Sequence, residues 1–221
     1  MRGIAEQLAD AGLSVELPLL PGHGTALEDL IPARWSDFCG AAEEAYLDLA
    51  ARCNTVVVVG LSMGGTLTCW LAERHPEING IVLVNPLVEP PTDEFRTAIA
   101  QLYESGTEVA PGIGSDIAKP GVLELSYAGT PLAAVLSLFE GAEEVALGLG
   151  RISCPVLLFS STEDHVVTPS NGDLVEASVS GPFERIRLER SYHVATLDYD
   201  RDEIEERTVA FVAAVDAEGE S

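Results

Sequence analysis

The sequence has little positive charge. Against 36 acidic residues it has 12 basic ones, with Lys119 as the one lysine, so the 221-residue chain has a formal net charge of −24. Nucleic acids and anionic membrane surfaces are bound mainly through basic side chains. We therefore expect neither as a partner. Because the acidic residues are spread along most of the chain, we interpret them as a solvated surface. A high-salt habitat, in which acidic surfaces stay soluble, is the alternative explanation.

Long apolar runs and paired cysteines are also missing. No stretch reaches the roughly 20 apolar residues of a membrane span, so we expect no stable membrane insertion. The N-terminus, MRGIAEQLADAG, does not resemble a signal peptide. Cys39, Cys53, Cys69 and Cys154 show no C-x-x-C spacing and no paired histidines. This pattern predicts reduced, mostly buried thiols of a cytoplasmic protein and no metal site.

What is present is an alternation of apolar strands and helical patterns. Strands are expected at about 14–20, in the valine run at 56–59, and in the segments GIVLVNP, CPVLLFSS and FERIRLER, the last of which alternates like an edge strand. Helices are expected at about 4–12, 35–52, 63–75 and 202–215. Continuously apolar strands separated by helices indicate βαβ units around a mostly parallel sheet. The sequence thus predicts one α/β domain over residues 1–221.

An insertion interrupts this alternation at about 87–150. Prolines open it, a helix is expected at Asp93–Glu104, residues 107–121 read as a loop, and a second helix is expected at about 131–149. We interpret the insertion as a small lid. Several apolar side chains within it are candidates for the lining of a tunnel, although such residues more often pack against the body; they are Leu87, Val88, Leu102, Leu132, Val135, Leu136 and Phe139.

The segment VVVVGLSMGG carries the clearest chemical signal. Gly60-Leu61-Ser62-Met63-Gly64 fits G-x-S-x-G, with an apolar strand before it and a helix after it, which is the context that this motif requires. Side chains at positions 60 and 64 are expected to collide with the neighbouring strand and helix. The bend would hold Ser62 in a strained conformation at the sheet edge, near the positive end of the following helix. The motif predicts that Ser62 is a nucleophile.

A serine nucleophile needs a histidine base. His23 precedes the serine in PGHG, His75 ends a helix, and His165 directly follows an acidic residue. His193, in RSYHVATLD, comes just after the last expected strand, where a loop can reach Ser62. We therefore expect His193 to be the base.

The base in turn needs a carboxylate to orient it. Asp164 follows the strand VLLFSS and is the first candidate; Glu163 is the second, and Asp198, within a run of acidic residues, is the third. The chain order Ser62, Asp164, His193 is the order found in α/β-hydrolases.

With these three motifs the chain resembles the α/β-hydrolases, and in particular bacterial carboxylesterases of the monoacylglycerol lipase type. The resemblance spans nearly the whole chain and implies the α/β-hydrolase fold. It implies that Ser62 is the nucleophile, that His193 is the general base and then acid, and that Asp164 orients His193. It also implies that Met63 donates its backbone N–H to an oxyanion hole, and that no cofactor or metal is needed.

The chain departs from this family at its beginning. Family members have a strand ending in His-Gly before the first helix, and that loop supplies a second oxyanion donor. Here Met1 already adjoins the first helix, and PGHG at 21–24 follows the next expected strand. The resemblance therefore predicts an N-terminally truncated sheet, lacking a central strand between residues 14–20 and the valine strand. The natural product would have about 30 more residues, one strand–loop unit with its lead-in. Losing one oxyanion donor costs about 10²–10³ in turnover.

These features predict a serine hydrolase of carboxylic esters with short or medium acyl chains, monoacylglycerols among them. Thioesterase, amidase or acyltransferase activity on the same triad is an alternative, because the fold hosts all of them. A non-catalytic binding protein is another, given the missing oxyanion loop. Dehalogenases and epoxide hydrolases are disfavoured because they have aspartate where this chain has Ser62. The sequence does not indicate an oligomeric state.

Overall fold

The computed structural model describes residues 1–219. The helices are α1 (Arg2–Asp10), α2 (Leu27–Leu30), α3 (Trp35–Ala50), α4 (Met63–Arg74), α5 (Asp93–Glu104), α6 (Leu132–Gly148), α7 (Ser170–Ser178) and α8 (Arg201–Gly219), with 3₁₀ turns at Leu149–Arg151 and Ala195–Leu197. The strands are β1 (Val57–Leu61), β2 (Gly80–Val84), β3 (Val109–Pro111), β4 (Gly129–Pro131), β5 (Val156–Ser161) and β6 (Phe183–Leu188). The expected helices are therefore confirmed, α5 to the residue.

A parallel sheet with the order β1-β2-β5-β6 forms the centre of the molecule. Every residue of β2 and β5 is buried, because both strands are internal and both faces of the sheet are covered. In β6 only Leu188 is fully buried, as expected for an edge strand. The predicted α/β class and parallel sheet are confirmed.

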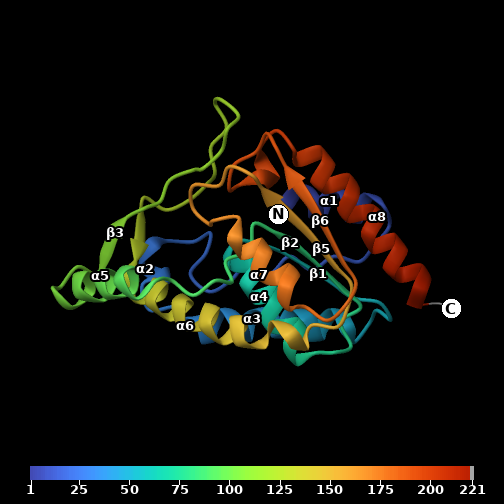
Figure 1. Cartoon of the computed structure of the whole chain (residues 1–221), viewed down its shortest axis with the longest axis horizontal. Helices are drawn as coiled ribbons and strands as arrows, with labels where there is room; N and C mark the ends of the chain where they lie inside the picture. The colour runs from blue at the N-terminus through green and yellow to red at the C-terminus, as the bar shows by residue number, and fades with distance from the viewer. Residues whose placement is uncertain (220–221) are drawn as a thin grey trace.

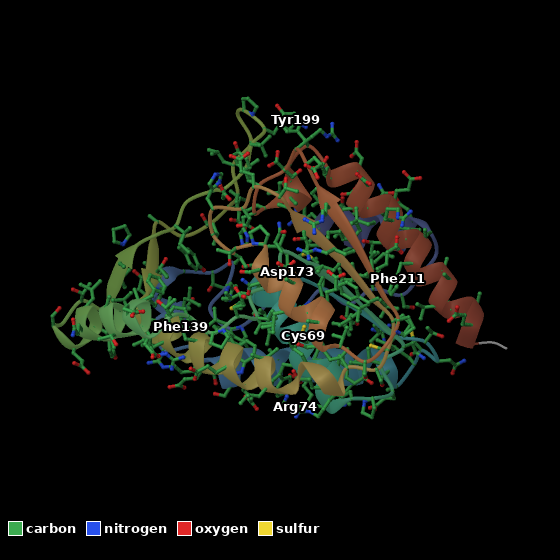
Figure 2. The ribbon with its side chains drawn as sticks, in the orientation of Figure 1. Cys69, Arg74, Phe139, Asp173, Tyr199 and Phe211 are labelled. Atoms are coloured by element: carbon green, nitrogen blue, oxygen red, sulfur yellow. The ribbon has the colours of Figure 1, made fainter. Side chains whose placement is uncertain are left out.

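Helices cover both faces of this sheet, with α1 and α8 on one side and α3, α4, α6 and α7 on the other (Figure 1). Alternate residues of the inner strands supply the two cores. Ile81, Leu83 and Leu158 face the α3–α4 side, whereas Val82 and Phe159 face the α1–α8 side. In Figure 2, Cys69 lies within the molecule and Arg74 lies near its edge, because α4 is buried over most of its length and is exposed at Arg74, its last residue.

The cysteines are unpaired, as the sequence predicts. Cys39 and Cys69 are buried, Cys53 and Cys154 are partly buried, and all four are free thiols. Burial raises the pKa of the Cys39 thiol to about 12, which makes this thiol unreactive at neutral pH. Within residues 1–219, no helix combines the length and the apolar character that crossing a membrane requires.

The insertion has two structurally different halves. Its first helix, α5, and the short antiparallel pair β3–β4 project from one end of the molecule (Figure 1). The pair includes residues 109–111, so the expectation of an uninterrupted loop at 107–121 is wrong. Its second helix, α6, packs against α3 and α4 as part of the body. A contact between Phe95 and Phe139, with ring centroids 5.8 Å apart, joins the two halves.

The strand expected at about 14–20 is wrong: residues 13–20 have no regular secondary structure, and Leu17 and Leu19 are exposed. A groove of about 750 Å³ separates this segment from β1, with Leu13 and Ser14 on one wall and Val57 on the other. A strand needs a hydrogen-bonded neighbour, and no backbone hydrogen bond joins this segment to β1 within the described residues. The expectation that a further N-terminal strand belongs in the sheet stays a prediction.

Candidate active site

The site begins at the turn between β1 and α4. Ser62 has φ 54° and ψ −120°, a conformation that non-glycine residues rarely adopt. Its backbone N–H donates to Val84 O at 3.0 Å, and its carbonyl accepts from the N–H groups of Gly65 and Thr66 at 2.8 and 3.2 Å. These bonds hold the strained turn. Met63 is the first residue of α4, so its N–H belongs to the helix terminus that has no intrahelical acceptor.

The glycines of this turn only partly meet the expectation. A Cβ on Gly60 would overlap Gly64 O and the Thr68 hydroxyl, as predicted. The expectation for Gly64 is wrong, because a Cβ there would meet no atom within 4 Å. The close approach falls instead on Gly65, where a Cβ would lie 2.6 Å from Pro86 Cβ. The helix turns by about 100° per residue, so the face in contact with Pro86 is that of the next glycine.

Asp164 lies in the loop after β5, with its side chain only 1% exposed. Its Oδ1 accepts the backbone N–H groups of Val166 at 2.9 Å and Val167 at 2.7 Å. This small loop therefore fixes the carboxylate and leaves Oδ2 available for another donor.

That donor is His193, whose Nδ1 lies 2.8 Å from Asp164 Oδ2. The imidazole is 7% exposed. Because the carboxylate accepts at Nδ1, the neutral ring carries its proton there and its Nε2 is an acceptor. Neither alternative acid takes this place. Glu163 is 67% exposed and faces His165 Nε2 at 3.5 Å, whereas Asp198 binds backbone N–H groups.

Ser62 and His193 line one cavity of about 630 Å³ at the carboxyl ends of the strands. The volume is that of a pocket for a small organic ligand. Apolar side chains make up much of its wall; they include Leu30, Leu61, Ile113, Leu125, Pro131, Val166 and Val194. The tunnel candidates of the insertion are not among the lining residues, because side chains such as Val88, Leu132 and Phe139 are buried in the body.

The rings of the other three histidines pair with groups other than Asp164. His75 pairs with Glu43 at 2.8 Å on the outer surface, and His165 pairs with Asp116 at 2.8 Å. His23 also lines the cavity, and its Nδ1 lies 3.2 Å from Pro21 O. Of the four histidines, His193 is therefore the one whose ring the structure joins to a buried carboxylate.

Two carboxylates of the insertion line the cavity, and sequence analysis missed both. Asp116 Oδ2 accepts the backbone N–H of His193 at 3.1 Å, and Asp116 O accepts that of Val194 at 3.0 Å. Burial raises the pKa of Glu124. No local pattern marks either residue, because each reaches the site through a contact between distant parts of the chain.

Asp198 has a structural place beside the site. Its Oδ2 accepts the N–H groups of Ala118 and Tyr192 at 2.7 and 2.9 Å, and its Oδ1 accepts those of Lys119 and Tyr199 at 2.9 and 2.8 Å. The carboxylate thus ties the insertion to the segment that precedes His193.

The model of the alpha/beta hydrolase family matches residues 3–207. A thermostable monoacylglycerol lipase of Bacillus sp. (strain H-257) is 46% identical over 217 residues, covering 96% of this chain and 84% of the relative. A structure from work on LipS and LipT, two metagenome-derived lipolytic enzymes, superposes with a TM-score of 0.92 at 39% identity, covering 97% of this chain and 87% of that one. A Paleococcus ferrophilus monoacylglycerol lipase has a TM-score of 0.73 at 18% identity, covering 96% and 88%, and shows the shared fold.

Proposed function

The chain belongs to the alpha/beta hydrolase family as a lipase- or esterase-like hydrolase, and we propose that it cleaves carboxylic esters with Ser62 as nucleophile, His193 as base and Asp164 as the orienting acid. One observation carries the proposal: His193 Nδ1 lies 2.8 Å from Asp164 Oδ2, and His193 lines the same cavity as Ser62. A buried carboxylate at Nδ1 is what an imidazole needs to accept a proton at Nε2.

The reaction proceeds in two acyl-transfer steps. His193 Nε2 takes the proton of the Ser62 hydroxyl as Oγ bonds to the ester carbonyl carbon. The tetrahedral intermediate expels the alcohol, which leaves with the proton from Nε2, and an acyl-enzyme remains. Water then loses a proton to Nε2 and attacks the acyl carbon, and Ser62 Oγ recovers the proton as the carboxylic acid departs. Asp164 stabilises the imidazolium that forms in both steps.

The negative oxygen of each intermediate needs donors. The Met63 N–H is directed from the amino end of α4 and has the partial positive charge of the helix dipole behind it. A donor that is already in position stabilises the negative charge that develops in the transition state. It therefore lowers the barrier without binding the substrate more tightly in the ground state. We assign Met63 N–H as one oxyanion donor.

The substrate we propose is an ester with a short or medium acyl chain, including monoacylglycerols. The apolar wall of the 630 Å³ cavity suits an acyl chain. A monoacylglycerol lipase at 46% identity supports the same class of substrate.

The test is turnover of a p-nitrophenyl ester series from acetate to palmitate, together with 1-monoacylglycerols, by the wild type and by Ser62→Ala. We expect turnover by the wild type, a maximum at short or medium chains, and no turnover by the variant. A fluorophosphonate should label the wild type and not Ser62→Ala. A folded wild type that neither turns over these esters nor reacts with the fluorophosphonate would instead favour a binding protein.

A further inference from the structure

Asn85 occupies an unusual position just after the internal strand β2. Its side chain is buried, with the residue 5% exposed, and its φ of 43° lies in the left-handed region. Asparagine tolerates this region better than other residues with a Cβ, yet the conformation still costs free energy. A strained and buried polar residue persists only where the surrounding contacts require it.

The contacts of its amide lead to the segment that carries His193. Nδ2 donates to His193 O at 2.8 Å and to Ser161 Oγ at 3.0 Å, while Oδ1 accepts Ser161 N–H at 2.8 Å. The Ser161 hydroxyl in turn donates to Tyr192 O at 2.9 Å. Two carbonyls of the histidine segment, residues 192–193, therefore have donors: the amide binds His193 O directly, and it binds Tyr192 O through Ser161. Ser161 ends β5, the strand that precedes Asp164.

The backbone on either side of Asn85 contacts the nucleophile. Val84 O accepts the N–H of Ser62 at 3.0 Å, and Leu87 N–H donates to Ser62 O at 3.3 Å. This is possible because β2 lies between β1, which leads to Ser62, and β5, which leads to Asp164 (Figure 1). One short segment therefore touches the backbone of the nucleophile and, through its side chain, the backbone of the base.

From this geometry we infer that Asn85 is a positioning residue, whose amide sets the position of His193 relative to Ser62. The inference rests on the proposed function, because it gives His193 the role of base. Asp116 holds the other backbone group of the same residue, by accepting His193 N–H at 3.1 Å. With its carbonyl and N–H both held by side chains, this residue is fixed before substrate binds. Such preorganisation matters because a displacement of about 1 Å at reacting groups can cost about 10²-fold in rate.

The amide suits this role for a specific reason. The position requires a donor for a buried carbonyl, an acceptor for a buried N–H, and tolerance of positive φ. Aspartate lacks the donor at neutral pH. Glycine tolerates the positive φ but has no side chain to bind either the buried carbonyl or the buried N–H. Asn85→Asp and Asn85→Gly therefore separate the amide from the backbone conformation.

Asn171 provides a matched control. It is also a buried amide, 4% exposed, and its Oδ1 accepts the N–H groups of Val88 and Glu89, both at 2.7 Å. It makes no hydrogen bond to the histidine segment within the described residues. Asn171→Asp should therefore cost stability in a similar way without displacing His193.

The experiment compares Asn85→Gly, Asn85→Asp and Asn171→Asp with the wild type. We expect both Asn85 variants to lose about 10- to 100-fold in kcat and in fluorophosphonate labelling rate, with KM changed less than about three-fold. Asn171→Asp should lower the melting temperature and leave kcat per folded molecule unchanged. The proton between His193 Nδ1 and Asp164, observed as a far-downfield ¹H NMR resonance, should shift or broaden in the Asn85 variants and not in the control.

Folded Asn85 variants that keep the wild-type kcat, labelling rate and resonance would overturn the inference. So would an equal loss of kcat in Asn171→Asp, because that result would indicate a general effect of lost stability. If Asn85→Gly does not fold, the isosteric Asn85→Asp is judged by the same measurements. A wild type without turnover whose resonance is nevertheless perturbed in the Asn85 variants would refute the proposed function and retain the positioning role.

Discussion

His193 Nδ1 lies 2.8 Å from Asp164 Oδ2, and the two side chains are only 7% and 1% exposed. The second oxygen of the carboxylate accepts two backbone N–H groups, so Asp164 cannot turn away without leaving them unpaired. The contact thus joins the loops after β5 and β6 across 29 residues of sequence. Their relative position decides which tautomer His193 adopts.

Asp164→Asn should therefore reduce kcat by about 10⁴-fold, because an amide at this position can donate to Nδ1 and favours the wrong tautomer. Asparagine Oδ1 can still accept from Val166 and Val167, so the fold should remain, as judged by circular dichroism. The matched control is Glu163→Gln, at an exposed neighbouring carboxylate, which should keep kcat within about two-fold. A larger loss in Glu163→Gln than in Asp164→Asn would make Glu163 the orienting acid.

Alanine at the two glycines of the motif should have opposite effects on stability. Gly60→Ala places a Cβ against Gly64 O and should cost about 1–3 kcal/mol in the free energy of unfolding, since α4 must move away from β1. In Gly64→Ala the new Cβ meets no atom within 4 Å, and alanine favours the helix more than glycine does. The free energy of unfolding should therefore stay the same or increase by up to about 1 kcal/mol. Urea unfolding of the two variants measures both values. Equal destabilisation would contradict the packing described for this turn.

The Asp116–His165 pair should make stability depend on pH. The hydrogen bond and charge of Asp116 raise the pKa of His165, with smaller contributions from Glu163 and Asp164. Burial alone would raise the pKa of Asp116, but hydrogen bonds from His165 and from the His193 N–H lower it overall. The His165 and Tyr192 rings make a T-shaped contact, with centroids 4.6 Å apart.

The contribution of His165 is complete below its unfolded pKa of about 6.5 and is lost as pH rises through the higher folded value. That of Asp116 is present above about pH 4 and is lost as pH falls through its lowered folded value. The melting temperature of the wild type should therefore exceed that of His165→Gln most near about pH 5, and the difference should disappear by about pH 8. A difference that is constant over this range would show that the pair does not titrate as described.

The contribution of Glu73 to stability should fall as pH rises, whereas that of a carboxylate with a lowered pKa increases. Its side chain is fully buried, and burial raises its pKa to about 7 although Arg151 donates to Oε2 at 2.8 Å; Oε1 has no partner within residues 1–219. Because the folded value lies above the unfolded one, stability falls as pH rises between the two. The melting temperature of the wild type minus that of Glu73→Gln should decrease from about pH 5 to about pH 8. Glu143→Gln, at an exposed partner of Arg96, should show no such trend.

Much of this architecture follows from local patterns. The helix at Asp93–Glu104 begins after Thr92, whose hydroxyl accepts the N–H of Phe95, and sequence analysis placed both of its ends. The internal strands β2 and β5 are continuously apolar, which is recognisable without a structure. The turn at Ser62 is marked by its glycines, because few sequences permit so tight a bend.

Local sequence patterns are misleading where an outcome depends on a distant neighbour. Residues 14–20 alternate like a strand, but a strand needs a partner, and β1 lies across a groove from this segment. At the motif, the close approach falls on Gly65 because Pro86, 21 positions away, lies against that face of α4. A periodic pattern reports which side of an element is apolar and leaves open what lies against it.

The sequence by itself determined the fold class, the parallel sheet and the order in which Ser62, Asp164 and His193 follow their strands, since short-range apolar periodicity and turn chemistry encode these features. Only the tertiary structure decided which carboxylate meets His193, and that Asn85 and Asp116 bind the backbone carbonyl and N–H of that residue. The reason is physical: these contacts join residues 29, 108 and 77 positions apart, and their geometry exists only once the sheet has brought the strand ends together.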